Sequence, residues 1–198
     1  MARSDQTQAA VLGGLSVMPM TGYALRNEIR DTLGHFWSES FGQIYPALAE
    51  LERQGLVERR GAERTGSSTF AITPAGTARL LDLLSEPAQP SPPRNGLLLR
   101  LFFGRQLGPA ACRTLVQRAR QQAEQQLAQL QAVRRELRDD REHAADSPYW
   151  LLTVSAGEHT ARATIAWADE TLAALAELAA EDGDSPPPSS PQPDKEQP

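Results

Sequence analysis

The sequence has little of the chemistry on which enzyme and metal sites depend. A single cysteine, Cys112, excludes a disulfide within the chain and provides no thiolate cluster for a metal ion. The three histidines, His35, His143 and His159, are scattered without the spacing of metal ligands. The sequence also has no glycine-rich phosphate loop, nucleophile elbow or pair of carboxylates at catalytic spacing. We therefore expect no enzymatic activity, no bound metal and no cofactor.

Long apolar runs are missing as well. The longest, residues 97–103, is interrupted by Arg100 and is far too short to cross a bilayer. The first eight residues lack the apolar core of a signal peptide. These two observations predict a cytoplasmic protein. Cys112 is expected to be buried by packing, because a free cysteine behaves as a small apolar residue. A redox-sensing thiol is the alternative, which would need exposure and a lowered pKa.

Positive charge is not in excess. The net charge of −5 argues against a protein that binds nucleic acid through its overall charge. The charge is distributed unevenly, with −2 over residues 1–93, +4 over residues 94–146 and −7 over residues 147–198. Any affinity for nucleic acid must therefore come from locally placed arginines that contact phosphates.

The most informative stretch that is present covers residues 38–57. Ile44, Leu48 and Leu51 recur at helical spacing, which predicts a helix with one buried face. Ser40 followed by Gln43 fits a capping box at the start of this helix, and Gly55 supplies its stop. The face left outside is polar and aromatic rather than a ladder of charges; it carries Phe41, Gln43, Tyr45, Glu50 and Arg53.

The residues around this stretch predict a small domain. A first helix is expected over residues 7–17, and a second over residues 22–33 with Thr21 as its N-cap. Two short strands, 56–60 and 68–72, are separated by a turn that contains Arg64. Thr73 and Pro74 then start a helix that runs to about residue 85.

The same residues resemble a known family. The motifs are Thr21-Gly22-Tyr23, Phe36-Trp37-Ser38, Gly42-Gln43-Ile44-Tyr45-Pro46-Ala47-Leu48 and Leu51-Glu52. They are similar to the winged helix-turn-helix of PadR-family transcriptional regulators. By this resemblance residues 41–54 form the recognition helix, and the two strands form the wing. Pro46 lies inside the predicted helix and removes a backbone donor, so a kink or an irregular first turn is expected there.

The rest of the chain predicts a separate helical region. The proline-rich residues 86–94 cannot be helical and indicate a linker. Helices are expected over residues 95–106, 110–143 and 149–180, followed by an acidic, proline-rich tail that cannot build a core. Residues 97–104 and 147–175 also resemble the C-terminal domain of the PadR group that is similar to virulence activators. The predicted domains are 1–85, a linker 86–95, 96–180 and a disordered tail 181–198.

The two long helices carry narrow apolar rows at alternating steps of three and four, typical of a coiled-coil seam. Such rows bury too little surface alone, so we expect the helices to pair with each other and with a second copy of the chain. The residues assigned to the homodimer interface are Val116, Ala119, Ala123, Leu130, Val133, Leu137, Ile165 and Leu172.

The fold class predicted is therefore mainly α: a winged helix-turn-helix of three helices and a two-stranded wing, followed by a helical dimerisation domain. We expect a homodimeric repressor that binds double-stranded DNA at a near-palindromic operator. Gln43 is the candidate base reader, because its amide can pair with the edge of adenine. The other residues assigned to the DNA interface are Thr21, Tyr23, Ser40, Phe41, Tyr45, Arg53, Arg64, Ser67 and Ser68.

Structural roles compete with these assignments. Thr21 can be only a helix cap and Tyr23 only the rim of a core, while the arginines of the wing can be a solvated hairpin tip. Family members usually carry basic residues just before the second wing strand, where this chain has Ser67, Ser68 and Thr69. The resemblance therefore implies weaker or more salt-sensitive DNA binding here.

The family resemblance also implies a small apolar or phenolic effector. Four aromatic residues are candidates for its pocket: Trp37, Phe102, Phe103 and Trp150. Ordinary packing in the core and in the dimer interface is the alternative for all four. Two other functions stay open: a regulator without an effector, and a protein-interaction module whose helix-turn-helix no longer binds DNA.

Overall fold

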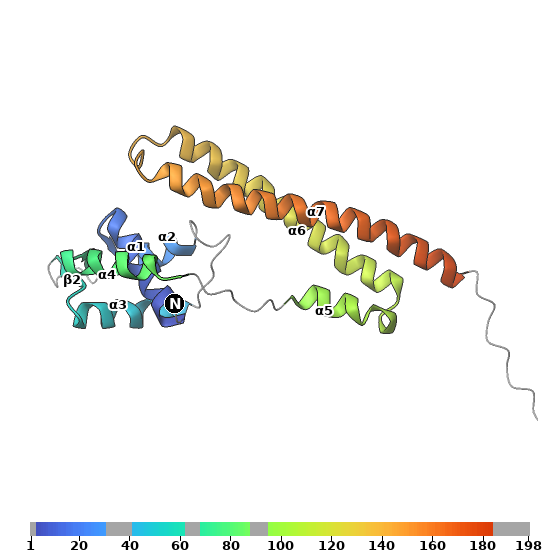
Figure 1. The fold of residues 1–198 in the computed structure, drawn as a ribbon, viewed down its shortest axis with the longest axis horizontal. Helices are drawn as coiled ribbons and strands as arrows, with labels where there is room; N and C mark the ends of the chain where they lie inside the picture. The colour runs from blue at the N-terminus through green and yellow to red at the C-terminus, as the bar shows by residue number, and fades with distance from the viewer. Residues whose placement is uncertain (1–2, 31–40, 62–67, 88–94, 184–198) are drawn as a thin grey trace, which may run out of the picture. The chain divides into compact units, whose positions relative to one another are not determined.

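The computed structural model describes residues 3–30, 41–61, 68–87 and 95–183. The chain divides into two compact units, residues 1–92 and residues 93–198, and each is described by itself (Figure 1). The elements of the first unit are α1 (Arg3–Val17), β1 (Met20–Thr21), α2 (Gly22–Glu28), the 3₁₀ turn η2 (Phe41–Gln43), α3 (Ile44–Arg53), β2 (Val57–Arg60), β3 (Thr69–Ile72) and α4 (Pro74–Ser85). Those of the second are α5 (Gly96–Phe102), the 3₁₀ turn η3 (Gly104–Gln106), α6 (Pro109–Asp139) and α7 (Ser147–Gly183).

The core of the first unit is built by one apolar face from each helix. Burying these faces out of water is the main favourable contribution to folding. The core side chains that are at most 2% exposed are Val11, Leu12, Leu15, Leu25, Ile44, Leu48, Leu51, Val57 and Leu83. The three predicted members of α3, Ile44, Leu48 and Leu51, are among them. The expected buried face of the recognition helix is thus confirmed.

The wing belongs to a sheet of three strands in the order β1-β3-β2. The two predicted strands of the wing are present as β2 and β3, which pair antiparallel with Val57 opposite Ile72 and Arg60 opposite Thr69. β1 was not predicted; it pairs antiparallel with β3 through Met20 and Thr21. Two residues are too few to show the alternation of apolar and polar side chains by which strands are recognised.

The start of α3 differs from the expected helix over residues 41–54. Phe41–Gln43 form a 3₁₀ turn and the α-helix begins at Ile44, with Gln43 as an N-cap whose side chain makes no capping bond. Ser40, the other half of the predicted capping box, lies outside the described residues. Pro46 is the third residue of α3, where a backbone N–H has no partner within the helix, so its missing donor costs nothing. The expected irregular first turn is present, but before Pro46.

Other helix ends follow their sequence signals. Thr21 Oγ1 accepts a hydrogen bond from Ala24 N at 3.1 Å, and Thr73 Oγ1 accepts one from Gly76 N at 3.1 Å. Gly55 has a φ of 71°, which only glycine adopts cheaply, and it follows Gln54, the C-cap of α3. α2 ends at Glu28 and is followed by a π-helical turn at Ile29 and Arg30; residues 31–33, where the helix was predicted to end, lie outside the described part.

The second unit is a hairpin of α6 and α7 with α5 packed near the start of α6 (Figure 1). The predicted seam lies between the two helices of one chain, where Val116, Ala123 and Leu130 of α6 are at most 5% exposed. Val154, Ala161 and Ala168 of α7 are buried on the facing side. α6 ends at Asp139, four residues before the predicted end at His143. α7 starts two residues early and continues to Gly183 instead of ending near Ala180.

One buried charge crosses this seam. Glu158 of α7 is 5% exposed and accepts hydrogen bonds from Arg134 Nε of α6 at 2.6 Å and from Arg162 Nη2 at 2.9 Å. The bond from Arg134 lowers the pKa of Glu158, with a smaller contribution from Arg162. Arg120 of α6 pairs with Asp169 of α7 in the same way at 2.6 Å, on the surface. Among the described residues, no helix combines the length and the apolarity needed to span a membrane.

Candidate nucleic-acid interface

The contact between α2 and α3 depends on a glycine. A Cβ placed on Gly22 would lie 2.8 Å from Cε1 of Tyr45 and 3.4 Å from Cδ1 of Leu48. Real Cβ atoms do not approach other atoms as closely as 2.8 Å, so only glycine lets the Tyr45 ring occupy this position. Thr21 caps α2 immediately before this contact, and Tyr23 follows it with 64% of its surface exposed. The Thr-Gly-Tyr motif therefore positions α2 against the recognition helix.

The outward face of α3 is exposed and mostly uncharged. Tyr45 is 50% exposed, and Gln43 is exposed at the start of the helix. The other exposed residues from Gly42 to Ala49 are small or lack long side chains: Gly42, Pro46 and Ala49. A helix with such a face can approach a groove closely, with polar side chains at its two ends. Of the residues assigned here, Ser40 and the side chain of Phe41 lie outside the described part.

The end of α3 holds a carboxylate with two donors. Arg53 Nε donates to Glu50 at 2.9 Å, its Nη2 donates to the other oxygen, and Gln54 Nε2 also donates to Glu50. The bond from Arg53, and then that from Gln54, lowers the pKa of Glu50 to about 2. The charge of Arg53, which was assigned to the DNA backbone, is therefore offset by Glu50 in this structure.

Arg59 of β2 joins the wing to the recognition helix. Its Nε and Nη2 both donate to the carboxylate of Glu52 on α3, each at 3.0 Å. Its Nη1 donates to Ser68 Oγ at 3.3 Å, and its guanidinium lies over the Phe70 ring, 5.1 Å from the centroid. The bond from Arg59 lowers the pKa of Glu52. Two parallel bonds to one carboxylate fix direction as well as distance, so this pair sets the angle between wing and helix.

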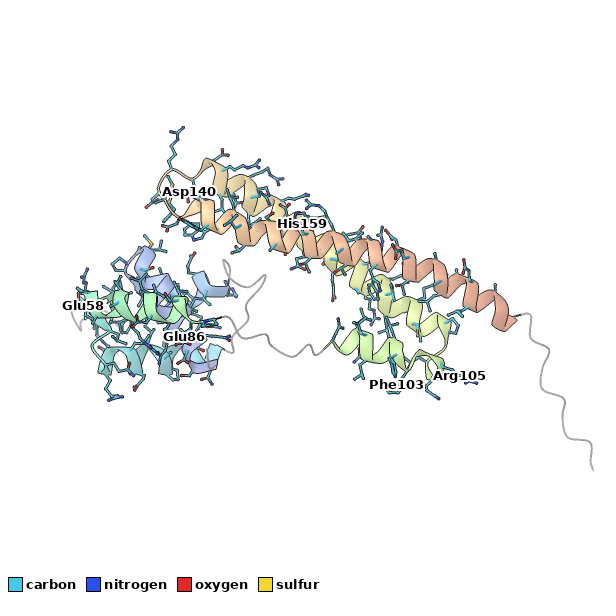
Figure 2. The ribbon with its side chains drawn as sticks, viewed as in Figure 1. Glu58, Glu86, Phe103, Arg105, Asp140 and His159 are labelled. Carbon is cyan, nitrogen blue, oxygen red and sulfur yellow. The ribbon has the colours of Figure 1, made fainter. Side chains whose placement is uncertain are left out.

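The other predicted wing residues are placed in part. Arg64 and Ser67 lie outside the described residues, whereas Ser68 is half-buried and accepts the bond from Arg59. Arg60 pairs with Glu58 on its own strand, Nε to Oε1 at 2.7 Å, and Figure 2 labels Glu58 on this strand. One glutamate therefore balances each of Arg53, Arg59 and Arg60.

The candidate effector residues are not brought together within one chain. Trp37 lies outside the described residues. Phe102 and Phe103, which are 82% and 57% exposed, precede α6, and Trp150 follows the turn at its far end. The 31 residues of α6 separate the two sites by about 45 Å. In Figure 2 the labels of Phe103 and Asp140 lie at opposite ends of α6. Within one chain Phe102 and Phe103 therefore do not lie beside Trp150, and the effector pocket stays a prediction.

The residues assigned to the dimer interface face the partner helix of the same chain. Val116, Ala123 and Leu130 are buried by α7, and Leu172 packs on the cluster of Cys112, Val116, Ala168 and Leu175. Ala119, Val133, Leu137 and Ile165 are half-buried along the same seam. A role of the assigned residues in a contact between two chains stays a prediction. Those that α7 buries completely have no exposed surface for such a contact.

Two features of the site were not visible in the sequence. Arg59 and Glu52 are seven residues apart with a helix end between them, so no spacing rule links them. The close approach at Gly22 depends on the packing of α2 on α3.

Cys112 is buried as predicted, with its sulfur 3.7 Å from the Gly104 carbonyl oxygen. Within the described ranges, no three histidine, cysteine or carboxylate side chains gather as metal ligands.

Comparison with known proteins gives two family matches along the chain. Residues 11–82 match the Transcriptional regulator PadR-like family, and residues 93–176 match the Virulence activator alpha C-term family. The Negative transcriptional regulator PadR of Bacillus subtilis is 28% identical over 98 residues, which cover 48% of this chain and 54% of that protein. The chain spans about half the length of the curated relatives it matches.

Solved structures share the fold over most of the chain. The PadR-like regulator BC1756 of Bacillus cereus matches with a TM-score of 0.73 and 21% identity, over 87% of this chain and 99% of that one. Bacillus subtilis PadR in complex with operator DNA matches with a TM-score of 0.72 and 22% identity, over 85% and 98%. A further structure of that protein is a complex with p-coumaric acid. The mainly helical fold with an N-terminal wing is confirmed, and the matched families are of regulators rather than enzymes. This chain belongs to the PadR-like family of transcriptional regulators and carries a C-terminal domain of the virulence-activator type.

Proposed function

We propose that this protein is a sequence-specific repressor that binds a near-palindromic operator as a homodimer. The observation that carries the proposal is the outward face of α3, which is exposed and carries no charged side chain from Gln43 to Ala49, so that it can enter a major groove. In helix-turn-helix proteins the first residues of the recognition helix contact base edges, and Gln43 occupies that position. The operator complex of Bacillus subtilis PadR supports the same mode of binding.

Affinity comes from geometry more than from excess charge. A glutamate is paired with each of Arg53, Arg59 and Arg60 and offsets its charge. A phosphate contact from such an arginine gains less than a contact from an arginine without a carboxylate partner. A dimer compensates for this weaker phosphate binding, because it binds both half-sites at once. Its two recognition helices lie about 34 Å apart, in successive major grooves.

Selection of DNA from a random pool by the purified full chain tests the proposal. We expect one enriched near-palindrome. Gln43→Ala should relax base preference at one position of each half-site by about 1–3 kcal/mol. Gln54→Ala, the same change at the other end of α3, is the matched control and should keep the preference. A uniform loss of affinity in Gln43→Ala, with unchanged preference, would show that Gln43 does not contact a base.

Arg64→Ala should behave differently from Gln43→Ala. The loss of one phosphate contact weakens binding to all sequences alike and lowers the slope of log K against log salt by about one phosphate per subunit. An unchanged slope would place Arg64 away from the DNA.

We further propose that a small phenolic compound releases the repressor. The p-coumaric acid complex of Bacillus subtilis PadR supports this class of ligand. An effector must bind the two states with different affinity in order to shift them, so it should weaken operator binding and not merely bind. Titration of the operator complex with p-coumaric acid, followed by DNA fluorescence anisotropy, tests it. Unchanged anisotropy at millimolar p-coumaric acid would remove this ligand from the proposal.

A protein-interaction module that no longer binds DNA is the second candidate function. A negative potential over the recognition face would favour it, and the balanced pairs of Arg53, Arg59 and Arg60 argue against such a potential. Enrichment of no sequence from the random pool, by a folded and dimeric protein, would make it the better proposal.

A further inference from the structure

The centre of the outward face of α3 is apolar. Pro46 and Ala49 are both exposed, and because they are three residues apart they lie on the same side of the helix. At about 100° of turn per residue, this side is nearly opposite the buried side of α3. Gln43 and Tyr45 lie on the two flanks of the same face. What faces outward at the centre of α3 is therefore alkyl surface, with polar groups only at its sides.

The polar side chains that follow Ala49 bond to one another. Both carboxylate oxygens of Glu50 accept hydrogen bonds from Arg53, and Gln54 Nε2 donates to the same carboxylate. This network satisfies Glu50 within the protein, so the carboxylate does not need a base as its donor. Pro46 has no backbone N–H, so its position in the first turn offers no donor to a phosphate either. The centre of the face can thus offer a base only apolar contact.

Gly42 continues this side toward the start of the helix, and packing within the chain does not require a glycine there. A Cβ on Gly42 would meet nothing within 4 Å, and its φ is not positive. Gly22 and Gly76 differ, because a Cβ there would collide with the Tyr45 ring or with the Leu56 carbonyl oxygen. Glycine also lets a backbone approach a ligand closely. An exposed glycine beside the base-contacting side, with no internal role, indicates such an approach.

We propose that Pro46 and Ala49 recognise thymine through its C5-methyl group, with Gly42 letting α3 come close enough to the bases for this contact. The proposal rests on the operator binding of the proposed function. It names the base that the centre of the recognition helix selects, whereas Gln43 on the flank was assigned to adenine.

Thymine is the base that an alkyl side chain can distinguish in the major groove. The edges of adenine, guanine and cytosine present hydrogen-bond donors and acceptors there, whereas thymine adds a methyl group. An alkyl group against a donor or acceptor removes its water without replacing the hydrogen bond, which costs free energy. Against the thymine methyl the same group buries apolar surface on both partners, which is favourable. Preference for thymine thus combines attraction at the right base with desolvation at the wrong ones.

The spacing of the two residues fits neighbouring base pairs. Three residues of an α-helix rise by about 4.5 Å. Successive base pairs of B-DNA are about 3.4 Å apart. Pro46 and Ala49 therefore match two adjacent base pairs better than a single one. We expect one or two thymines in each half-site, next to each other, whose methyl groups contribute to affinity.

Replacement of thymine by uracil removes only this methyl group and tests the proposal on the unaltered full chain. The probe is the duplex that the wild type enriches from a random pool, with each thymidine replaced in turn by deoxyuridine. At the contacted positions the dissociation constant, measured by fluorescence anisotropy, should rise about fourfold, the equivalent of burying one methyl group. The other replacements should leave it unchanged. Insensitivity to uracil at every position would overturn the proposal.

Ala49→Gly assigns the contact to its residue. This variant should bind the thymine and uracil duplexes equally at the position that Ala49 contacts, because the side-chain methyl that distinguishes them is gone. Pro46→Gly should do the same at the neighbouring thymine. Ala47→Gly is the matched control: it weakens the same helix, but Ala47 packs against the core. It should keep the fourfold preference for thymine. The same preference in Ala49→Gly would show that Ala49 does not make the contact.

Gly42→Ala tests the close approach. Operator affinity should fall at least tenfold, because the added methyl stands between α3 and the bases. The midpoint of urea unfolding should equal or exceed that of the wild type, since the Cβ meets nothing within the chain. Gly13→Ala is the control: its Cβ also has open space, but Gly13 belongs to α1. Wild-type operator affinity in Gly42→Ala would show that the approach does not depend on glycine.

The two proposals fail in distinguishable ways. If the wild type enriches a palindrome in which every thymine can be replaced by uracil without loss of affinity, the thymine contact is wrong and the repressor stands. If a folded wild type enriches no sequence at all, the repressor is wrong, and the thymine contact is wrong with it.

Discussion

Tyr45 of the recognition helix lies against Gly22 at the start of α2, 2.8 Å from the point where any other residue would carry its Cβ. Gly22, in the Thr21-Gly22-Tyr23 motif, thus determines where the ring of Tyr45, in the motif of residues 42–48, lies. Because Tyr45 is half exposed, its ring can be displaced, and the consequence for DNA binding should exceed the consequence for folding.

Gly22→Ala should therefore lower operator affinity while changing the free energy of unfolding by less than about 1 kcal/mol, since the added methyl also restricts the unfolded chain. Gly13→Ala is the control, because a Cβ there meets nothing within 4 Å and removal of a glycine from inside α1 should stabilise by about 0.5–1 kcal/mol. Urea unfolding and operator anisotropy measure the two quantities. Normal affinity in Gly22→Ala would show that the Tyr45 ring has no part in the complex.

Glu52→Gln separates the electrostatics of the interface from its geometry. Removing a negative charge near DNA should tighten binding if charge alone matters. If the bidentate pair with Arg59 fixes the wing, the same change should weaken binding roughly fivefold, the equivalent of the about 1 kcal/mol of an exposed pair. Glu58→Gln, which removes the same charge from the pair with Arg60, is the control. Tighter binding by both variants would exclude a positioning role for Arg59.

The turn between α6 and α7 should respond to pH through His143. Its Nδ1 lies 2.9 Å from Asp140 Oδ2, and this bond raises the pKa of His143 above its ordinary value. Because the pKa is raised, the bond between His143 and Asp140 stabilises the folded state fully at a pH below the unfolded pKa of about 6.5. This stabilisation is lost as the pH rises through the folded pKa. The His143 ring is 5.5 Å from the Trp150 ring, so tryptophan emission should change with a midpoint above 6.5. His143→Gln should abolish that transition; its persistence would assign it to another group.

Glu158 should make the second unit sensitive to acid. Its pKa is lowered by the bond from Arg134, so its contribution is present above the unfolded value near 4.5 and is lost as the pH falls through the lowered folded value. Glu158→Gln should destabilise the hairpin by about 2 kcal/mol at pH 7, since Arg134 loses its charged acceptor. Thermal unfolding of wild type and variant should converge as the pH falls below 4. A constant difference between pH 7 and pH 3 would contradict this role.

The sequence by itself determined the local structure of this protein. Ile44, Leu48 and Leu51 set the buried face of α3, Thr21 and Thr73 set the helix starts, and Gly55 set a helix end. These features depend on residues within one or two turns of each other, so spacing reveals them. The short motifs around Tyr45 were also sufficient to indicate the family.

Tertiary structure decided which surfaces are available. The apolar seam of α6, which predicts pairing, is filled by α7 of the same chain, so Val116 and Leu130 face inward. Phe102 and Trp150 are aromatic in the sequence, but the length of α6 places them far apart. Arg59 could as well have faced solvent, and only the packing of the sheet on α3 brings it to Glu52. Each of these contacts joins residues that are distant in the sequence. The hydrophobic pattern determines that one face of a helix is buried, but it does not determine which neighbouring element covers that face.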